Sequence, residues 1–448
     1  MDAVTLNSQC SVDDHDRPSA ETWQAFVWLA VILALTAGFG LGGALFAAPL
    51  LGVPTSAWWP AAAQAHAHVQ LFGWGGLMVL GVGFHFLPRL RGRSLAHPER
   101  ARLVLILLGA GLVLRAISQP LLGLTDAPAW RTALVLSGVL ELAGLTTALG
   151  MLAQTLAEAP PVRSRAGLWQ VVPFLATAFA AFWLALLVNV LGTTIAALGG
   201  ASRVPDWADS LQNLLGLYGF LVPISMGMGV RVFPLHFGAR LPGLPLLRAG
   251  LAALLAGLGL RVTGSLAGIP VVTSAGLAAS AAALALFVAG SHVFARRRAI
   301  PGARRPWFGE PAQWLGLSAF AWLTLDALLL VVAALAPLLP ATGSVPLRAE
   351  WHILGTGFVT LLIFGEGVNL LPGFGGRPLR SEGLVWATLA LGNLATVLRV
   401  GPVLLPAVFP DPHGRWALAA SGLLGLLAVA LFAANLTGAR SVRTPGVR

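Results

Sequence analysis

The sequence is poor in charge. Only 10% of its 448 residues are charged, it contains no lysine, and it has one tyrosine and one cysteine. Soluble globular chains usually carry about a quarter charged residues, so an ordinary soluble fold is excluded. The lone Cys10 excludes a disulfide within the chain and a thiolate metal cluster. Nucleic-acid binding is excluded too, because there is no polar domain to carry a basic surface.

Hydrophobic residues make up 57% of the chain and fall in long runs. A helix needs roughly 20 apolar residues to cross about 30 Å of hydrocarbon, so each run predicts a membrane span. Twelve runs are found, at about 24–48, 62–88, 102–123, 131–156, 168–199, 211–237, 245–268, 271–295, 312–339, 350–372, 383–407 and 416–438. The sequence thus predicts an all-α, polytopic helical bundle in the lipid bilayer, forming a single transmembrane domain over residues 1–448.

The arginines predict the orientation. The net charge is +11, and in membrane proteins such an excess gathers in cytoplasmic loops. If the polar tail at residues 1–22 is cytoplasmic, the arginine-rich segments 89–102, 296–305 and 440–448 lie on the same side. Few arginines then remain on the other side. We therefore expect a multi-pass protein of the cell inner (cytoplasmic) membrane with both termini in the cytoplasm.

One segment occurs three times. Residues 66–93 read HAHVQLFGWGGLMVLGVGFHFLPRLRGR. At an offset of 146 residues, glycines and the final proline match again. At an offset of 284 they match once more, and His68 falls on His352. These copies lie on spans two, six and ten, which predicts three pseudo-repeated four-helix units at about 24–156, 168–295 and 312–438.

Histidines on two of these copies suggest a cofactor site. Imidazole is a common axial ligand of haem iron, and two repeat-related helices could each supply one at the same depth. His352 is one candidate, and its partner is either the repeat-equivalent His68 or His66. The latter two point about 200° apart, so only one can reach a given iron. Alternatively, each histidine is merely a hydrogen-bonded polar residue. Glycines are expected to make room for the flat macrocycle, at Gly73, Gly75, Gly76, Gly355 and Gly357.

Carboxylates also occur within the spans, at Glu141, Asp326 and Glu366. A carboxylate at membrane depth costs a few kcal/mol, so a functional role is the default hypothesis. Glu366 is expected to join an intramembrane polar network with His85, Arg231 and Asn369. Such a network would be either a proton path or a structural feature.

The histidine-led second span, its G-x-G-x-x-x-x-P ending and the W-H-I-L-G-T-G run at 351–357 resemble the NnrS family of haem-containing membrane proteins. More distantly, the chain is similar to subunit I of heme-copper oxidases, in which helices two, six and ten hold the haems. The tenth helix of those oxidases carries H-x-H, whereas Glu350 stands at the first position here. Spans six and seven also lack outer-half histidines. The resemblance therefore implies a low-spin haem at His352 with His66 or His68, and no high-spin haem and copper centre.

The expected function is haem binding linked to nitric oxide, nitrosative stress or respiratory redox chemistry. The nitric oxide link comes only from the resemblance. Because NnrS proteins are associated with haem and copper, a metal such as copper on the remaining histidine is kept as a second cofactor. Two alternatives stay open. One is a divergent oxidase-like electron-transfer subunit with a quinol or cytochrome partner and further redox subunits, and the other is a cofactor-free transporter.

Overall fold

The computed structural model describes residues 17–160, 170–295, 309–338 and 347–438. Within these ranges all regular structure is helical, and twelve helices are long and apolar enough to cross a membrane. They are Thr22–Leu50, Trp58–Arg91, Pro98–Thr125, Pro128–Glu158, Val172–Leu198, Asp206–His236, Leu244–Ala267, Pro270–Ser291, Pro311–Leu335, Arg348–Gly375, Glu382–Leu404 and His413–Leu436. The predicted fold class and number of spans are confirmed. The boundary between spans seven and eight is real, because Gly268 adopts a left-handed φ of 64° and Pro270 begins the next helix.

Eight spans consist essentially of one α-helix each. These are α5 (Ala101–Thr125), α6 (Pro128–Glu158), α7 (Val172–Leu198), α10 (Leu244–Ala267), α11 (Pro270–Ser291), α12 (Pro311–Leu335), α15 (Glu382–Leu404) and α16 (His413–Leu436). The other four contain a π-helical segment. Span 1 is α1 (Arg17–Leu33), η2 (Ala34–Gly38) and α2 (Phe39–Leu50), and span 2 is α3 (Trp58–His68), η3 (Val69–Gly76) and α4 (Leu77–Arg91). Span 6 is α8 (Asp206–Leu214), η7 (Leu215–Leu221) and α9 (Val222–His236), and span 10 is α13 (Arg348–His352), η9 (Ile353–Thr360) and α14 (Leu361–Gly375).

The π segments η3, η7 and η9 lie at the centre of the bundle. They contact one another pairwise, and each starts directly after a repeat-equivalent position, namely His68, Leu214 and His352. In spans 2, 6 and 10, 78%, 83% and 61% of the most apolar window is buried, against 33–56% elsewhere. A π turn holds an extra residue and often marks a functional site. Its threefold recurrence agrees with the three repeats, whose division into four-helix units stays a prediction.

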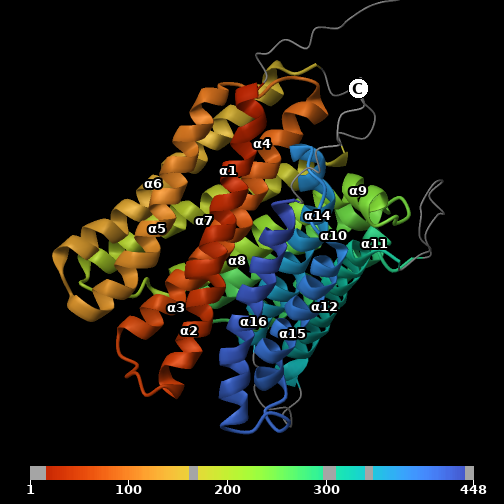
Figure 1. The fold of residues 1–448 in the computed structure, drawn as a ribbon. Coiled ribbons are helices and arrows are strands. Elements are labelled where there is room, and N and C mark those ends of the chain that lie inside the picture. The colour runs from red at the N-terminus through yellow and green to blue at the C-terminus, as the bar shows by residue number, and fades with distance from the viewer. Residues whose placement is uncertain (1–16, 161–169, 296–308, 339–346, 439–448) are drawn as a thin grey trace, which may run out of the picture.

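The outer spans close around this centre, and the last span packs against the first through α16 and α2 (Figure 1). We call the end where spans 2, 6 and 10 begin the histidine end, and the opposite end the arginine end. In Figure 1 the α2–α3 and α15–α16 connections mark the histidine end at the bottom. Much of the predicted tail at residues 1–22, and segments 296–305 and 440–448, lie outside the described residues. Which end faces the cytoplasm therefore stays a prediction.

Glycines set the close packing of α10 against α11. A Cβ on Gly264 would lie 2.5 Å from the backbone nitrogen of Thr273, so any side chain must push the helices apart. We expect Gly264→Ala to destabilise the protein by about 1–3 kcal/mol, the usual cost of overpacking. On the same helix, a Cβ on the exposed Gly259 meets nothing within 4 Å. Gly259→Ala should be neutral or gain about 0.5–1 kcal/mol, since glycine disfavours helix. Thermal unfolding in detergent compares the two variants, and equal midpoints would contradict this packing.

Candidate functional site

A cavity at the histidine end lies between spans 1, 2, 10, 11 and 12. Its cavity volume is about 250 Å³, and all non-atom space including the open mouth amounts to about 1060 Å³. Its polar wall residues are His66, Gln70, His352, Thr356, Arg399 and Ser421, and its aromatic ones are Phe39, Phe46, Trp59 and Trp351. Two imidazoles from the second and tenth spans thus face one enclosed space.

His66 is held in place by span 1. Its Nδ1–H donates to the carbonyl of Gly38 over 2.9 Å, since a carbonyl can only accept. Gly38 ends the π segment η2, and its ψ of −111° takes the backbone off the helical path at that point. The ring packs against Gly42, where a Cβ would come within 2.7 Å of Cε1. With Nδ1 committed, Nε2 carries the lone pair, which is how metal-ligating histidines are usually oriented.

His352 is held by its own helix. Its imidazole hydrogen-bonds the backbone of Arg348, one turn earlier. The ring is close enough to His66 for a charge on one to act on the other. Each imidazole is thus oriented by a backbone hydrogen bond while both line the same space.

Arg399 supplies the cavity with a positive charge. Its guanidinium lies 4.2 Å from the ring centre of Phe46, and both cavity histidines feel its field. Within the described part of the chain Arg399 has no carboxylate partner. Cations removed from water are normally paired, so a cavity walled by this arginine favours a ligand that carries an anionic group.

His68 faces another part of the bundle. It is fully buried, with Nε2 2.6 Å from Oε2 of Glu141 and Nδ1 2.9 Å from Nε2 of Gln212. Both ring nitrogens are therefore occupied by spans 4 and 6. The structure brings His66 and His352 together, and it does not bring His68 to their cavity.

The predicted threefold repeat accounts for this difference. Residues at equivalent positions of three related helices point to equivalent interfaces. Each of these interfaces lies between a different pair of helices, so two equivalent residues do not face the same one. His68 and His352 are equivalent, so each faces its own interface. His66 lies two residues earlier and about 200° around the helix, so it points back toward span 10.

The glycines expected to accommodate a macrocycle mostly pack helices instead. A Cβ on four of them would meet side chains of other helices at 2.7–3.2 Å: Gly73 against Leu33, Gly75 against Leu221, Gly76 against Phe182 and Gly357 against Trp322. Only Gly355 both lines the cavity and has nothing within 4 Å of its Cβ position. Gly42 and Gly422 line the cavity as well.

The polar network expected at the arginine end has a different composition. Glu366 pairs with Nδ1 of His236, which the sequence reasoning had not connected to it. His85 instead stacks on Phe374 at 4.0 Å between ring centres. Asn369 donates to the carbonyl of Gly365 in its own helix, at 2.9 Å. Arg231 does not pair with Glu366.

A second buried group lies between spans 6, 7, 9 and 10. Arg261 binds Glu350 with both arms, at 2.7 and 3.0 Å, and its guanidinium lies 4.9 Å from the ring centre of Tyr218. Tyr218 donates to Oδ2 of Asp326 at 3.1 Å. An ion pair thus occupies the position where the oxidase-like H-x-H pattern would place another histidine.

Sequence reasoning missed the three membrane-embedded arginines, Arg115, Arg261 and Arg399. The available signal was an arginine inside a long apolar run, which is rare and points to a buried partner or a site. Among the described residues, no three His, Cys, Asp or Glu side chains lie together in a way that could hold a metal ion. Within that part of the chain, the cavity thus presents two imidazoles without a third ligand of these types.

Comparisons with known proteins identify the fold. No family model matches the chain, and no curated protein matches it either. A cryo-EM structure of a heme-copper terminal oxidase dimer is similar over 95% of this chain and 85% of that chain, with a TM-score of 0.59 and 11% sequence identity. The protein thus shares its twelve-span membrane fold with a heme-copper terminal oxidase.

Proposed function

We propose that the protein binds haem in the cavity at the histidine end, where His66 and His352 would hold it. The observation that carries this proposal is the shared cavity, in which imidazoles from spans 2 and 10 face one space and each is oriented by a backbone hydrogen bond. The open Gly355 wall and the unpaired Arg399 fit the group, because haem is flat and carries two propionates.

Bound there, haem would supply reversible one-electron chemistry. The residues around it would set its geometry. Gly38 fixes the tautomer and plane of His66, and Arg399 offers its charge to a propionate. The aromatic wall excludes water. This arrangement favours electron transfer between redox partners in the inner membrane over catalysis on the iron.

The link to nitric oxide or nitrosative stress is a finer proposal that rests on the sequence resemblance to NnrS proteins. Copper has less support than haem, because the cavity offers two imidazoles and no third His, Cys, Asp or Glu ligand. A centre of copper and high-spin haem has no support, because Glu350 stands at the first position of the H-x-H pattern and is bonded to Arg261.

A cofactor-free transporter is not favoured by any specific contact. Each intramembrane carboxylate noted in the sequence has a polar partner, with Glu141 on His68, Asp326 on Tyr218 and Glu366 on His236. The direct test is an absorption spectrum of protein purified in detergent from haem-replete cells. We expect a Soret band and sharp visible bands on reduction, and a colourless protein would overturn the proposal.

Filling the cavity should block haem without unfolding the protein. Gly355→Phe places a ring into the space beside His352, where a Cβ meets nothing within 4 Å. We expect haem content to fall by at least about tenfold, the lower range seen when a metal site is disturbed, while the unfolding midpoint stays close to that of the wild type. Gly150→Phe is the matched control, because Gly150 is exposed and equally unobstructed. Full haem content in Gly355→Phe would place the cofactor elsewhere.

A further inference from the structure

Spans 2 to 6 enclose a polar cluster on the side of span 2 that faces away from the histidine cavity. We call it the Glu141 cluster, and its members are His68, Arg115, Glu141, Asn189 and Gln212. All five side chains are buried, at 0–1% exposure. None of them lines the proposed haem cavity.

The cluster contains polar atoms without hydrogen-bond partners. All three nitrogens of Arg115, both amide atoms of Asn189 and Oε1 of Glu141 are buried and unsatisfied. A buried guanidinium has five N–H donors, and leaving such groups unpaired is costly. In folded proteins the great majority of buried polar atoms have a partner, either protein or ordered water. The orphaned atoms therefore indicate molecules bound among them.

The spacing of the charges indicates what these molecules are. Arg115 is close enough to Glu141 and Asp209 for their charges to interact, yet it is hydrogen-bonded to neither. One guanidinium facing two carboxyl groups leaves no excess positive charge to hold an anion. Arg115 equally disfavours a metal cation. The unsatisfied atoms include donors and acceptors, which suits a neutral molecule that can both donate and accept, as water does.

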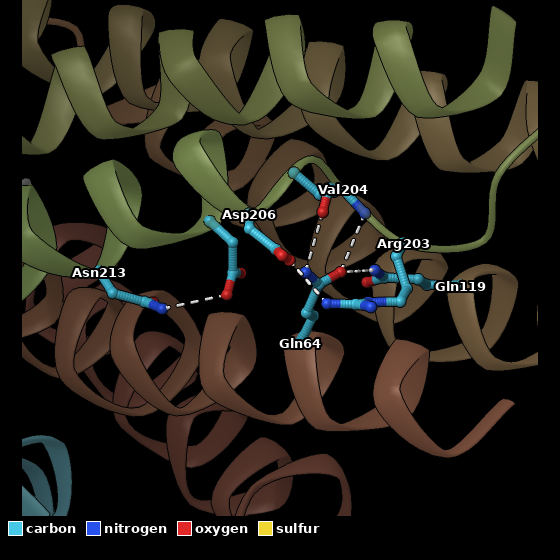
Figure 2. Close-up of polar contacts among 7 residues, drawn as sticks. Gln64, Gln119, Arg203, Val204, Asp206 and Asn213 are labelled. Carbon is cyan, nitrogen blue, oxygen red and sulfur yellow. Dashed lines mark hydrogen bonds and ion pairs between the residues drawn. The ribbon is translucent and has the colours of Figure 1, made fainter. Parts of the chain in front are cut away.

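Further polar groups lie between the cluster and the histidine end. Asp209 is only partly buried, and its Oδ2 accepts from Nδ2 of Asn213 at 3.5 Å. Nearby, Gln64 is hydrogen-bonded to both backbone polar groups of Val204 and accepts from Gln119, which anchors the segment before span 6 (Figure 2). Two further buried atoms lack partners along span 3, Oγ of Ser118 and Oε1 of Gln119. Ser118 and Gln119 lie one turn from Arg115, toward the histidine end.

We propose that the Glu141 cluster binds internal water molecules that bridge Arg115 to Glu141 and continue past Asp209 to the histidine end. The site would be a hydrated access path into spans 2 to 6, separate from the haem cavity. Span 2 then serves two interfaces through one H-x-H pair, with His66 facing the cofactor and His68 facing the water site.

A cryo-EM map of the wild type at a resolution that shows ordered water tests the site directly. We expect at least two separate water-sized peaks within about 3 Å of Arg115 nitrogens or Glu141 Oε1. Arg115 bonded directly to a carboxylate, with no such peak, would overturn the proposal. So would a single peak that gains density when bromide replaces chloride, because that marks an anion.

Thiol accessibility tests the path to the surface. A variant that carries Asn189→Cys together with Cys10→Ser has one thiol, at position 189. This thiol should react with Ag⁺, which is narrow enough to pass along a water path. Asn393→Cys is the matched control, because Asn393 is also a membrane asparagine but has protein partners at both amide atoms. Its thiol should stay free. Equal protection of both thiols, in protein that retains the wild-type unfolding midpoint, would contradict a path from the surface. Neither readout depends on haem, so this proposal and the haem proposal can fail separately.

Discussion

Replacing His352 by alanine is expected to remove the Soret band from the purified protein. His352 is the only histidine of span 10 and faces the cavity together with His66. Loss of an axial ligand should lower haem content by at least about tenfold, since even disturbing the residues that orient a metal ligand costs 10- to 100-fold in affinity. His66→Ala should have the same effect, and haem per protein by pyridine haemochrome assay measures both.

His68→Ala is the informative control. Its ring nitrogens are committed to Glu141 and Gln212, away from the cavity, so the haem content of this variant should match the wild type. The variant should instead unfold more easily, because Glu141 loses its buried partner. If His68→Ala loses haem and His66→Ala retains it, the proposed ligand pair is wrong.

Breaking the buried ion pair between Arg261 of span 7 and Glu350 of span 10 should have the largest effect on stability. Arg261 and Glu350 are both buried and bonded through two contacts, and removing one partner leaves an uncompensated charge. Arg261→Met is therefore expected to cost about 3–5 kcal/mol. The double variant Arg261→Met with Glu350→Leu removes both charges and should recover most of that loss. Unfolding in detergent measures all three proteins.

Comparing these variants also tests what the Arg261–Glu350 ion pair contributes. A double variant that is as unstable as Arg261→Met would contradict simple charge compensation and point to a shape requirement at Glu350. Haem content of the double variant should stay near the wild-type level, because neither side chain lines the histidine cavity.

The number of spans could be predicted because membrane insertion depends on local composition. Each crossing must satisfy its own backbone in lipid, so a long apolar run is a strong signal. The second, sixth and tenth spans were also correctly singled out by the repeat. The sequence did not show that these three spans are the most buried and therefore lie at the centre. It did show the glycines that let helices such as α10 and α11 approach closely.

The pairing of side chains could not be predicted, because it depends on rotation about each helix axis. The sequence equated His68 with His352, but equivalence in a pseudo-threefold bundle assigns them to different interfaces. The π segments add to this, since an extra residue in a turn rotates every side chain beyond it and leaves no periodic signature. Glu366 meets His236 and not His85 for the same kind of reason.

The central claim is that two imidazoles from spans 2 and 10 complete the coordination of one haem iron. Near-infrared magnetic circular dichroism of the oxidised wild-type protein tests it most directly, because the ligand-to-metal band of low-spin ferric haem reports the axial pair. We predict a low-spin signal of bis-histidine type with one haem per chain. A high-spin signal, a low-spin signal of another ligand pair, or protein that lacks haem after purification from haem-replete cells would contradict it.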